Sequence, residues 1–162
     1  MILNLAMKDT TTNVVSLYKY MMNAQGPKDL LEENSRTEVF LKRYDFLNKT
    51  VKKTVEKAEK EIDKKNNFLF FTYGGEMSLS QDISNELTYK YPHLKIVIGF
   101  IKGGHVKFSL RGEKIRTLMV NAIKNIEGAT GGGHEFSCGA QMSSEYVQTF
   151  KENFLEEMKK LK

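Results

Sequence analysis

"LKIVIGFIKGGHVKFSLR" occupies Leu94–Arg111 and determines the architecture of the second half of the chain. Its first eight residues form a nearly continuous apolar run, which is typical of a buried strand. Gly103 and Gly104 follow as a two-residue hairpin signal. His105–Arg111 then alternates between polar and apolar residues, which is typical of a strand with one buried face. The stretch therefore predicts a β-hairpin whose second strand carries a polar face.

Apolar periodicity on both sides of this hairpin predicts further elements. Upstream, "FLFFTY" at 68–73 is a short apolar run that predicts a strand. Ser78 and Gln81 form a capping-box signature for a helix over about 79–89. Downstream, helices are predicted near 115–126 and 146–161, and a short strand is predicted near 138–142. The order is typical of an α/β domain with a mixed sheet of about four to five strands and one hairpin, covered by helices and preceded by a helical segment.

The first part of the chain is predicted to be helical. Gly26 and Pro27 end a first apolar stripe, and Pro27 is suited to open a short second helix. Apolar residues then recur every three or four positions, which predicts one long amphipathic helix over 36–65. We expect residues 1–35 to be the helical tail of a preceding domain or a linker. Residues 36–162 are expected to form one domain that includes the long helix.

Composition excludes several protein classes. No apolar run approaches the ~20 residues that span a bilayer, and the N-terminus lacks the pattern of a signal peptide. One cysteine cannot form an internal disulfide, and three scattered histidines cannot complete a Cys/His zinc cage. The net charge is +5, and most of the excess lies over 42–65. A solvated helix face explains that excess better than a dedicated nucleic-acid surface. We expect a cytoplasmic protein without a membrane partner.

"GATGGGHEFSCGAQM" at 128–142 holds five of the twelve glycines, one histidine and the single cysteine. Consecutive glycines let several backbone N–H groups turn towards one point, and such a nest binds phosphate. His134 would add a side-chain donor. The alternative is a tight loop that joins a helix to an edge strand. Arg111, at the end of the polar hairpin strand, favours the phosphate site because its guanidinium can bind an anion with two parallel hydrogen bonds.

These residues resemble the DHH-associated domain of the first subtype. That domain is the C-terminal substrate-binding part of DHH-family phosphoesterases, which include RecJ-like exonucleases, oligoribonucleases and cyclic-dinucleotide phosphodiesterases. The family pattern is a strand ending in serine-x-arginine, a helix, a glycine run with a histidine, and then small residues. The resemblance covers roughly 66–162 and implies a substrate site formed by Ser109, Arg111, Gly131, Gly132, Gly133 and His134. Glu135 and Cys138 depart from the pattern, where the family often has proline and alanine.

The resemblance implies a substrate-binding domain that acts on short oligonucleotides or dinucleotides. In the family, aspartates and histidines of an N-terminal DHH catalytic domain hold two manganese ions. The five aspartates of this chain stand alone, and no Asp-His-His sequence occurs. We therefore expect no catalytic residue, metal site or cofactor within this chain. The parent protein would be a hydrolase, and this chain, as a fragment of it, would be inactive alone.

Two other functions compete with this one. Similar domains close alanyl-tRNA synthetases, where they bind tRNA, and the basic segment over 42–65 would then be the binding surface. A structural module whose long helix forms a homodimer is the second alternative. A Cys–His hydrolase built from Cys138 and His134 is disfavoured, because a small packed cysteine explains Cys138 better.

Overall fold

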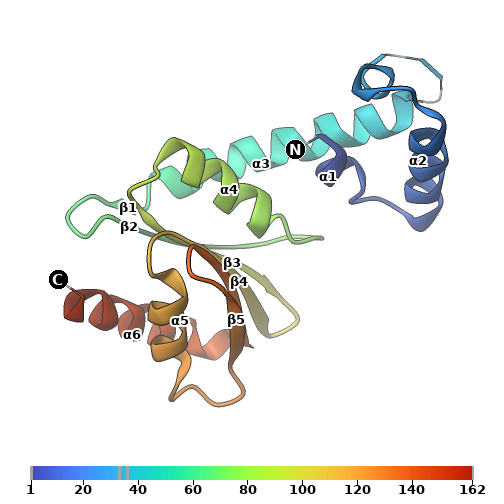
Figure 1. The fold of residues 1–162 in the computed structure, drawn as a ribbon. Coiled ribbons are helices and arrows are strands. Elements are labelled where there is room, and N and C mark those ends of the chain that lie inside the picture. Colours follow the sequence, from blue (N-terminus) through green and yellow to red (C-terminus); the bar gives the residue numbers. More distant parts are fainter. Residues whose placement is uncertain (1, 33, 36, 162) are drawn as a thin grey trace. The chain divides into compact units, whose positions relative to one another are not determined.

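Six strands form one mixed sheet in the order β1-β2-β3-β4-β6-β5. The computed structural model describes residues 2–32, 34–35 and 37–161, and these strands lie within that part of the chain (Figure 1). The strands are β1 (Ile62–Asp63), β2 (Phe68–Gly74), β3 (Lys95–Lys102), β4 (His105–Arg111), β5 (Thr130–His134) and β6 (Ser137–Ser143). β2 and β3 are parallel, and all other neighbouring strands are antiparallel.

The α/β class and the mixed sheet predicted from the sequence are confirmed, but the sheet has six strands rather than four to five. One additional strand is the two-residue β1. The other is β5, which the glycine run forms where the sequence predicts a loop. β5 and β6 are joined by a turn at Glu135 and Phe136, so this end of the sheet is a further hairpin.

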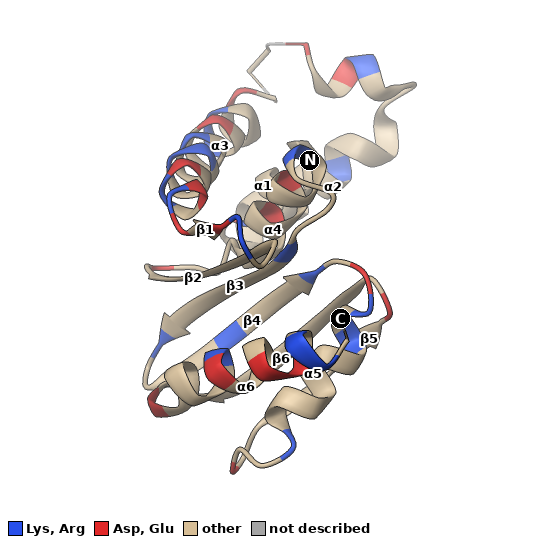
Figure 2. Ribbon diagram, turned by 90° about the vertical axis from the view of Figure 1, so that its left-hand side faces the viewer, with Lys and Arg blue, Asp and Glu red and all other residues tan. Residues whose placement is uncertain are grey.

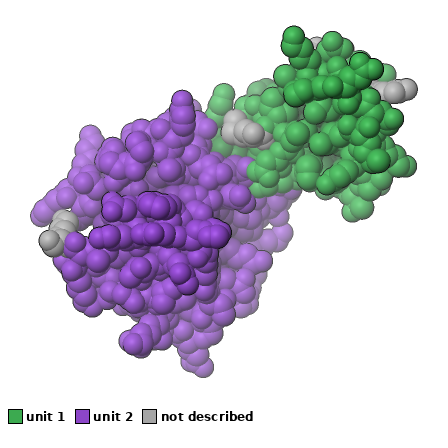
Figure 3. All heavy atoms as spheres, viewed as in Figure 1, with its two compact units in different colours: residues 1–53 green, residues 54–162 purple. Residues whose placement is uncertain are grey.

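The chain divides into two compact units, residues 1–53 and 54–162, which Figure 3 colours separately. Helix α3 (Glu38–Glu59) spans the boundary between the units. It ends at Glu59 rather than near residue 65, because the chain turns back into the sheet. Asp63 Oδ1 accepts hydrogen bonds from the backbone N–H groups of Lys65 and Asn66, and this turn returns the chain to β2.

Within residues 54–162, helices cover both faces of the sheet (Figure 1). α4 (Ser80–Lys90) packs on β3 and β4 from one side. α5 (Ile115–Ile123) and α6 (Val147–Lys160) pack on the other side, where Phe108, Phe150 and Phe154 belong to one apolar core. Helical cover on both faces explains why β3 is a nearly unbroken apolar run. The alternation of β4 is confirmed, since Val106 and Leu110 are fully buried while their neighbours are more exposed.

α4 begins at Ser80, one residue later than predicted. The residue before the helix is Leu79, which makes no side-chain cap. The Leu79 N–H instead donates to the Tyr73 hydroxyl at 2.6 Å, and the Ser78 and Ser80 hydroxyls lie 2.8 Å apart. The hydrogen bond from Leu79 to Tyr73 therefore ties the start of α4 to strand β2.

The first 53 residues form a small helical unit of their own. Its elements are α1 (Ile2–Ala6), α2 (Thr11–Asn23), the 3-10 turn η1 (Pro27–Leu30) and the first part of α3. Ala6, Leu17 and Phe40 form its apolar centre. Pro27 opens η1, as the sequence predicts.

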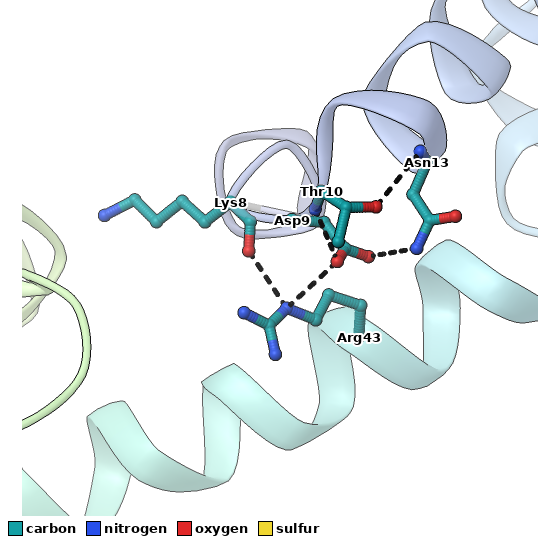
Figure 4. Close-up of polar contacts among 5 residues, drawn as sticks. All are labelled: Lys8, Asp9, Thr10, Asn13 and Arg43. Carbon is teal, nitrogen blue, oxygen red and sulfur yellow. Dashed lines mark hydrogen bonds and ion pairs between the residues drawn. The ribbon is translucent and has the colours of Figure 1, made fainter.

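Polar contacts at the start of α2 hold this unit together (Figure 4). Thr10 Oγ1 accepts a hydrogen bond from the Asn13 N–H and so caps the helix. Arg43 on α3 donates from Nε to the Lys8 carbonyl at 2.9 Å and lies 4.0 Å from the Asp9 carboxylate. Arg43 therefore links α3 to Lys8 and Asp9 in the turn between α1 and α2.

Candidate functional site

The register of the sheet places Arg111 and His134 in one row. Arg111 on β4 pairs with Ser137 on β6, and Ser137 pairs in turn with His134 on β5. Directly paired residues of neighbouring strands point to the same face of a sheet. Because strands lie about 4.8 Å apart, the Arg111 and His134 backbones are roughly 10 Å apart. Two residues 23 positions apart in the printed sequence are therefore near neighbours on one face.

The next row brings Ser109 and Gly132 to that same face. Ser109 pairs with Gly139, and Gly139 pairs with Gly132. This is the face that α4 covers in part, since the Ser109 hydroxyl lies 3.0 Å from that of Ser84 on α4. α4 covers the face over β3 and β4, and the rows continue from β4 across β6 to β5. Ser109, Arg111, Gly132 and His134 thus share a polar face beside α4.

The glycine run has a different structure from the one predicted. It is an edge strand rather than a loop, so successive backbone N–H groups point in opposite directions instead of towards one point. β6 pairs with only one side of β5, and every second N–H of β5 therefore points away from the sheet. The predicted nest is replaced by a strand edge that presents single backbone donors.

The three glycines serve different purposes. A Cβ on Gly131 would lie 2.5 Å from Met119 Sδ on α5, so Gly131 permits close packing on the core side. Gly133 has φ +138° and would bring a Cβ within 2.7 Å of the Cys138 backbone. Gly132 has no atom within 4 Å of that position, and its φ is not positive. Only Gly132 therefore leaves space open where neither packing nor backbone conformation requires glycine.

A cavity of about 400 Å³ lies on this face, and we call it the Arg111 cavity. It is open to solvent and lies between the sheet and the start of α4. Its lining residues from the sheet are Lys107, Phe108, Ser109, Arg111, Gly132, Gly133, Ser137, Cys138 and Gly139, and those around the start of α4 are Ser78, Ser80 and Gln81. Four of the six predicted site residues line it. Gly131 faces α5, and His134 lies on the exposed hairpin beside the cavity.

Arg111 is the cation at the centre of this site. Its Nε donates to Asn85 Oδ1 at 3.0 Å, and its Nη1 donates to the Leu110 carbonyl at 2.8 Å. Among the described residues, no carboxylate lies within ion-pair distance of it. The side chain is half-buried, and this burial lowers the pKa of Arg111. A half-buried guanidinium without a carboxylate partner is suited to bind an anion.

Cys138 is a packing residue, as the sequence analysis favours. Its side chain is 6% exposed and belongs to the apolar core under α5 and α6. Burial raises the pKa of its thiol to about 11, although Arg111 and Arg116 act in the opposite direction. The thiol is therefore protonated at neutral pH and is a poor nucleophile.

Sequence reasoning missed the contribution of α4. Asn85 fixes the Arg111 guanidinium, and Ser84 contacts Ser109. Each of the two α4 residues is 25 or more positions along the chain from its partner on β4. A local signal existed in the helix itself. Ser80, Asp82 and Ser84 are buried polar residues on a helix whose other buried positions are apolar. Polar residues on the sheet-facing side of a helix indicate a polar partner on the sheet.

Two classes of feature are not found in the part of the chain that the structure describes. No three or more His, Cys, Asp or Glu side chains come close enough together there to hold a metal ion. Of the helices in that part, none is both long and apolar enough to cross a membrane.

Comparison with known proteins gives no family model and no curated protein that matches the sequence. The fold does match solved structures. RecJ from Thermus thermophilus in complex with Mn²⁺ superposes with a TM-score of 0.68 at 8% identity, over 98% of this chain and 23% of that one. The pGpG-specific phosphodiesterase PggH from Vibrio cholerae superposes with a TM-score of 0.60 at 14% identity, over 98% of this chain and 57% of that one. CDC45 from Entamoeba histolytica superposes with a TM-score of 0.60 at 9% identity, over 98% of this chain and 36% of that one.

The chain has the fold of part of the DHH-family proteins. The resemblance inferred from the serine–arginine strand and the glycine–histidine run is thereby confirmed at the level of the fold. This chain spans between 23% and 57% of the length of these three proteins.

Proposed function

We propose that this chain is the substrate-binding part of a metal-dependent DHH-family phosphoesterase that acts on short oligonucleotides or dinucleotides. One observation carries the proposal. Arg111 is half-buried at an open cavity and is oriented by Asn85, and none of the described carboxylates neutralises it. A phosphate is the ligand that best complements such a guanidinium. The fold shared with RecJ and PggH supports this ligand class.

In this proposal each predicted residue has a distinct role. Arg111 binds a phosphate with two parallel hydrogen bonds, and Ser109 donates or accepts beside it. Gly132 lets the ligand approach the edge strand, because no side chain fills that space. His134, in the same row as Arg111, contacts the ligand from the β5–β6 hairpin. Gly131 packs against α5, and Gly133 shapes the strand where it lines the cavity.

The described residues do not fit a metal ion, since they hold no cluster of potential ligands. We therefore assign no hydrolytic step to this chain. Manganese would be held by a DHH catalytic domain outside it. Residues 36–162 would then form the substrate-binding domain, and residues 1–35 would connect it to that catalytic domain.

Calorimetric titration with pGpG at fixed salt tests this function. Arg111→Ala is compared with a variant in which Lys52, Lys53 and Lys57 on α3 are all changed to glutamine. We expect Arg111→Ala to lose affinity and the triple variant to retain it. If the triple variant loses more, the basic helix binds the ligand, as in the tRNA-binding alternative.

A second measurement concerns catalysis. The pure chain is incubated with pGpG and Mn²⁺, and the products are separated by chromatography. We expect no turnover. Hydrolysis that Mn²⁺ stimulates and a chelator abolishes would show that the chemistry resides in this chain after all.

A further inference from the structure

A second cavity of about 390 Å³ lies beside the Arg111 cavity, and we call it the Lys102 cavity. The residues that line it are Ser78, Phe100, Lys102, His105, Lys107 and Gln141. Ser78 and Lys107 line both cavities, so the two hollows are adjacent. The glycine–histidine pattern indicates only the Arg111 cavity, since none of the predicted site residues lines the Lys102 cavity.

The sheet register shows that both cavities open on the same face. Phe100 on β3 pairs with Lys107 on β4, and Lys107 pairs with Gln141 on β6. Lys102 pairs with His105 in the row beyond. Polar and basic side chains at alternate positions of β4 therefore run from Arg111 through Lys107 to His105.

The lining of the two cavities is basic. Of the residues that the structure describes, no acidic one lines either cavity. Lys102 donates from Nζ to the Glu76 carbonyl at 2.7 Å, which holds the ammonium group at the end of β3. Within the described part of the chain, neither Lys102 nor Lys107 forms an ion pair. Figure 2 shows basic positions, in blue, along β4 and where β3 ends.

The spacing of the basic residues along β4 limits which ligand could occupy both cavities. A strand rises about 3.3 Å per residue, so the Arg111 and Lys107 backbones are roughly 13 Å apart. Lys102 pairs with His105, which lies two residues further along β4, so a single phosphate held by Arg111 is not expected to reach Lys102 as well. A chain of linked nucleotides offers charges repeated along its length and fits such a groove.

We propose that the Lys102 cavity is a second phosphate subsite, which binds the next phosphate of the nucleotide chain held by Arg111. This inference rests on the proposed function. Phe100 supplies the apolar floor of the subsite. Its side chain is 6% exposed, and its ring centroid lies 5.4 Å from that of Tyr73. Lys102, His105 and Lys107 supply the donors at its rim. The groove consequently distinguishes linked nucleotides from a mononucleotide.

The experiment compares pGpG with GMP, and GMP binding is measured by competition against pGpG. The test variant is Lys102→Gln with His105→Gln, both at exposed positions. Its matched control is Lys124→Gln with His93→Gln, which removes the same residue types from exposed positions outside both cavities. Arg111→Ala is measured alongside.

We expect the test variant to weaken pGpG binding by roughly tenfold while GMP affinity changes less than about twofold. Arg111→Ala should weaken both ligands, and the matched control should weaken neither. Equal losses for GMP and pGpG, or no loss for either, would overturn the second subsite while an effect of Arg111→Ala keeps the proposed function. If Arg111→Ala changes neither affinity, or if pGpG does not bind, the proposed function fails and the subsite fails with it.

Discussion

Arg111 on β4 is fixed by Asn85 on α4, through a hydrogen bond of 3.0 Å from Nε to Oδ1. The two residues are 26 positions apart, and only the packing of α4 on the sheet brings them together. This bond, with the one to the Leu110 carbonyl, uses two of the five guanidinium donors. The remaining donors are available to a ligand in the Arg111 cavity.

Arg111→Ala is therefore expected to weaken pGpG binding by roughly ten- to a hundredfold. A charge-assisted bidentate contact is worth roughly 1.5–3 kcal/mol, and about 1.4 kcal/mol corresponds to a tenfold change. Arg111→Lys should recover only part of this, because an ammonium group lacks the planar geometry. Asn85→Ala should weaken pGpG binding a few-fold, because the Arg111 guanidinium keeps its charge but is no longer held in one orientation. Calorimetric titration of the three variants checks the order. An Asn85→Ala loss as large as that of Arg111→Ala would mean that Asn85 itself contacts the ligand.

The three glycines of β5 should respond differently to substitution. Gly132→Val should leave the free energy of unfolding within about 0.5 kcal/mol, because the position is extended and its side is open. Its side chain would fill the approach to the edge strand, and pGpG affinity should fall at least about tenfold. Gly131→Ala and Gly133→Ala should each destabilise the fold by about 1 to 3 kcal/mol.

Urea unfolding and pGpG titration on the same three variants separate these effects. Gly131→Ala serves as the matched comparison, since it alters the neighbouring glycine on the opposite face. If Gly132→Val unfolds the protein as readily as Gly131→Ala does, the glycine run has only a structural purpose. If it folds normally and binds pGpG unchanged, no ligand approaches β5.

The hairpin of β3 and β4 could be predicted because its signals are local. Gly103 and Gly104 both adopt positive φ at the turn, and the alternation of His105–Arg111 matches its burial. β5 could not be predicted in this way, because glycine has a low intrinsic preference for strands. Pairing with β6 and close packing of Gly131 on Met119 override that preference.

The residues of the site likewise differ in whether a local pattern could predict them. The polar face of β4 follows from alternation, so Ser109 and Arg111 could be placed on it from the sequence. Asn85 and Ser84 could not, because they reach this face through helix packing. Gly132 is part of the predicted site only through the family resemblance, and strand order brings it to this face. Strand order is non-sequential here, with β6 between β4 and β5. No pattern along the chain specifies that β6, rather than β5, pairs with β4.

Cys138 should make stability depend on alkaline pH. Burial raises the pKa of the folded thiol to about 11, whereas the ordinary value is 9.0. Between these values the unfolded chain has released the thiol proton and the folded chain has retained it, so the stability contributed by the neutral thiol is lost as pH rises from about 9 to 11. At about 1.4 kcal/mol per unit, the loss is about 2 to 3 kcal/mol.

Urea unfolding of the wild type and Cys138→Ala at pH 8, 9, 10 and 11 measures this loss. Lysines and tyrosines titrate in both proteins, so the difference between the two unfolding free energies isolates the thiol. That difference should move in favour of Cys138→Ala as pH rises. A difference that stays constant from pH 8 to 11 would show that the folded thiol ionises as readily as the unfolded one.

Glu135 is expected to weaken phosphate binding, and its removal should strengthen it. The turn that carries it is held by its own backbone, since the carbonyls of Glu135 and Phe136 accept hydrogen bonds from Ile115 and Gly112 at 3.0 and 3.1 Å. The backbone of Glu135 is therefore held beside His134, next to the row that contains Arg111, and its side chain is exposed. Glu135→Gln should raise pGpG affinity about two- to threefold at low salt, and the gain should shrink as salt screens the charge. Glu127→Gln, at an exposed position outside both cavities, is the matched control and should change nothing. A lower affinity for Glu135→Gln would show instead that this carboxylate accepts a hydrogen bond from the ligand, where the family often has proline.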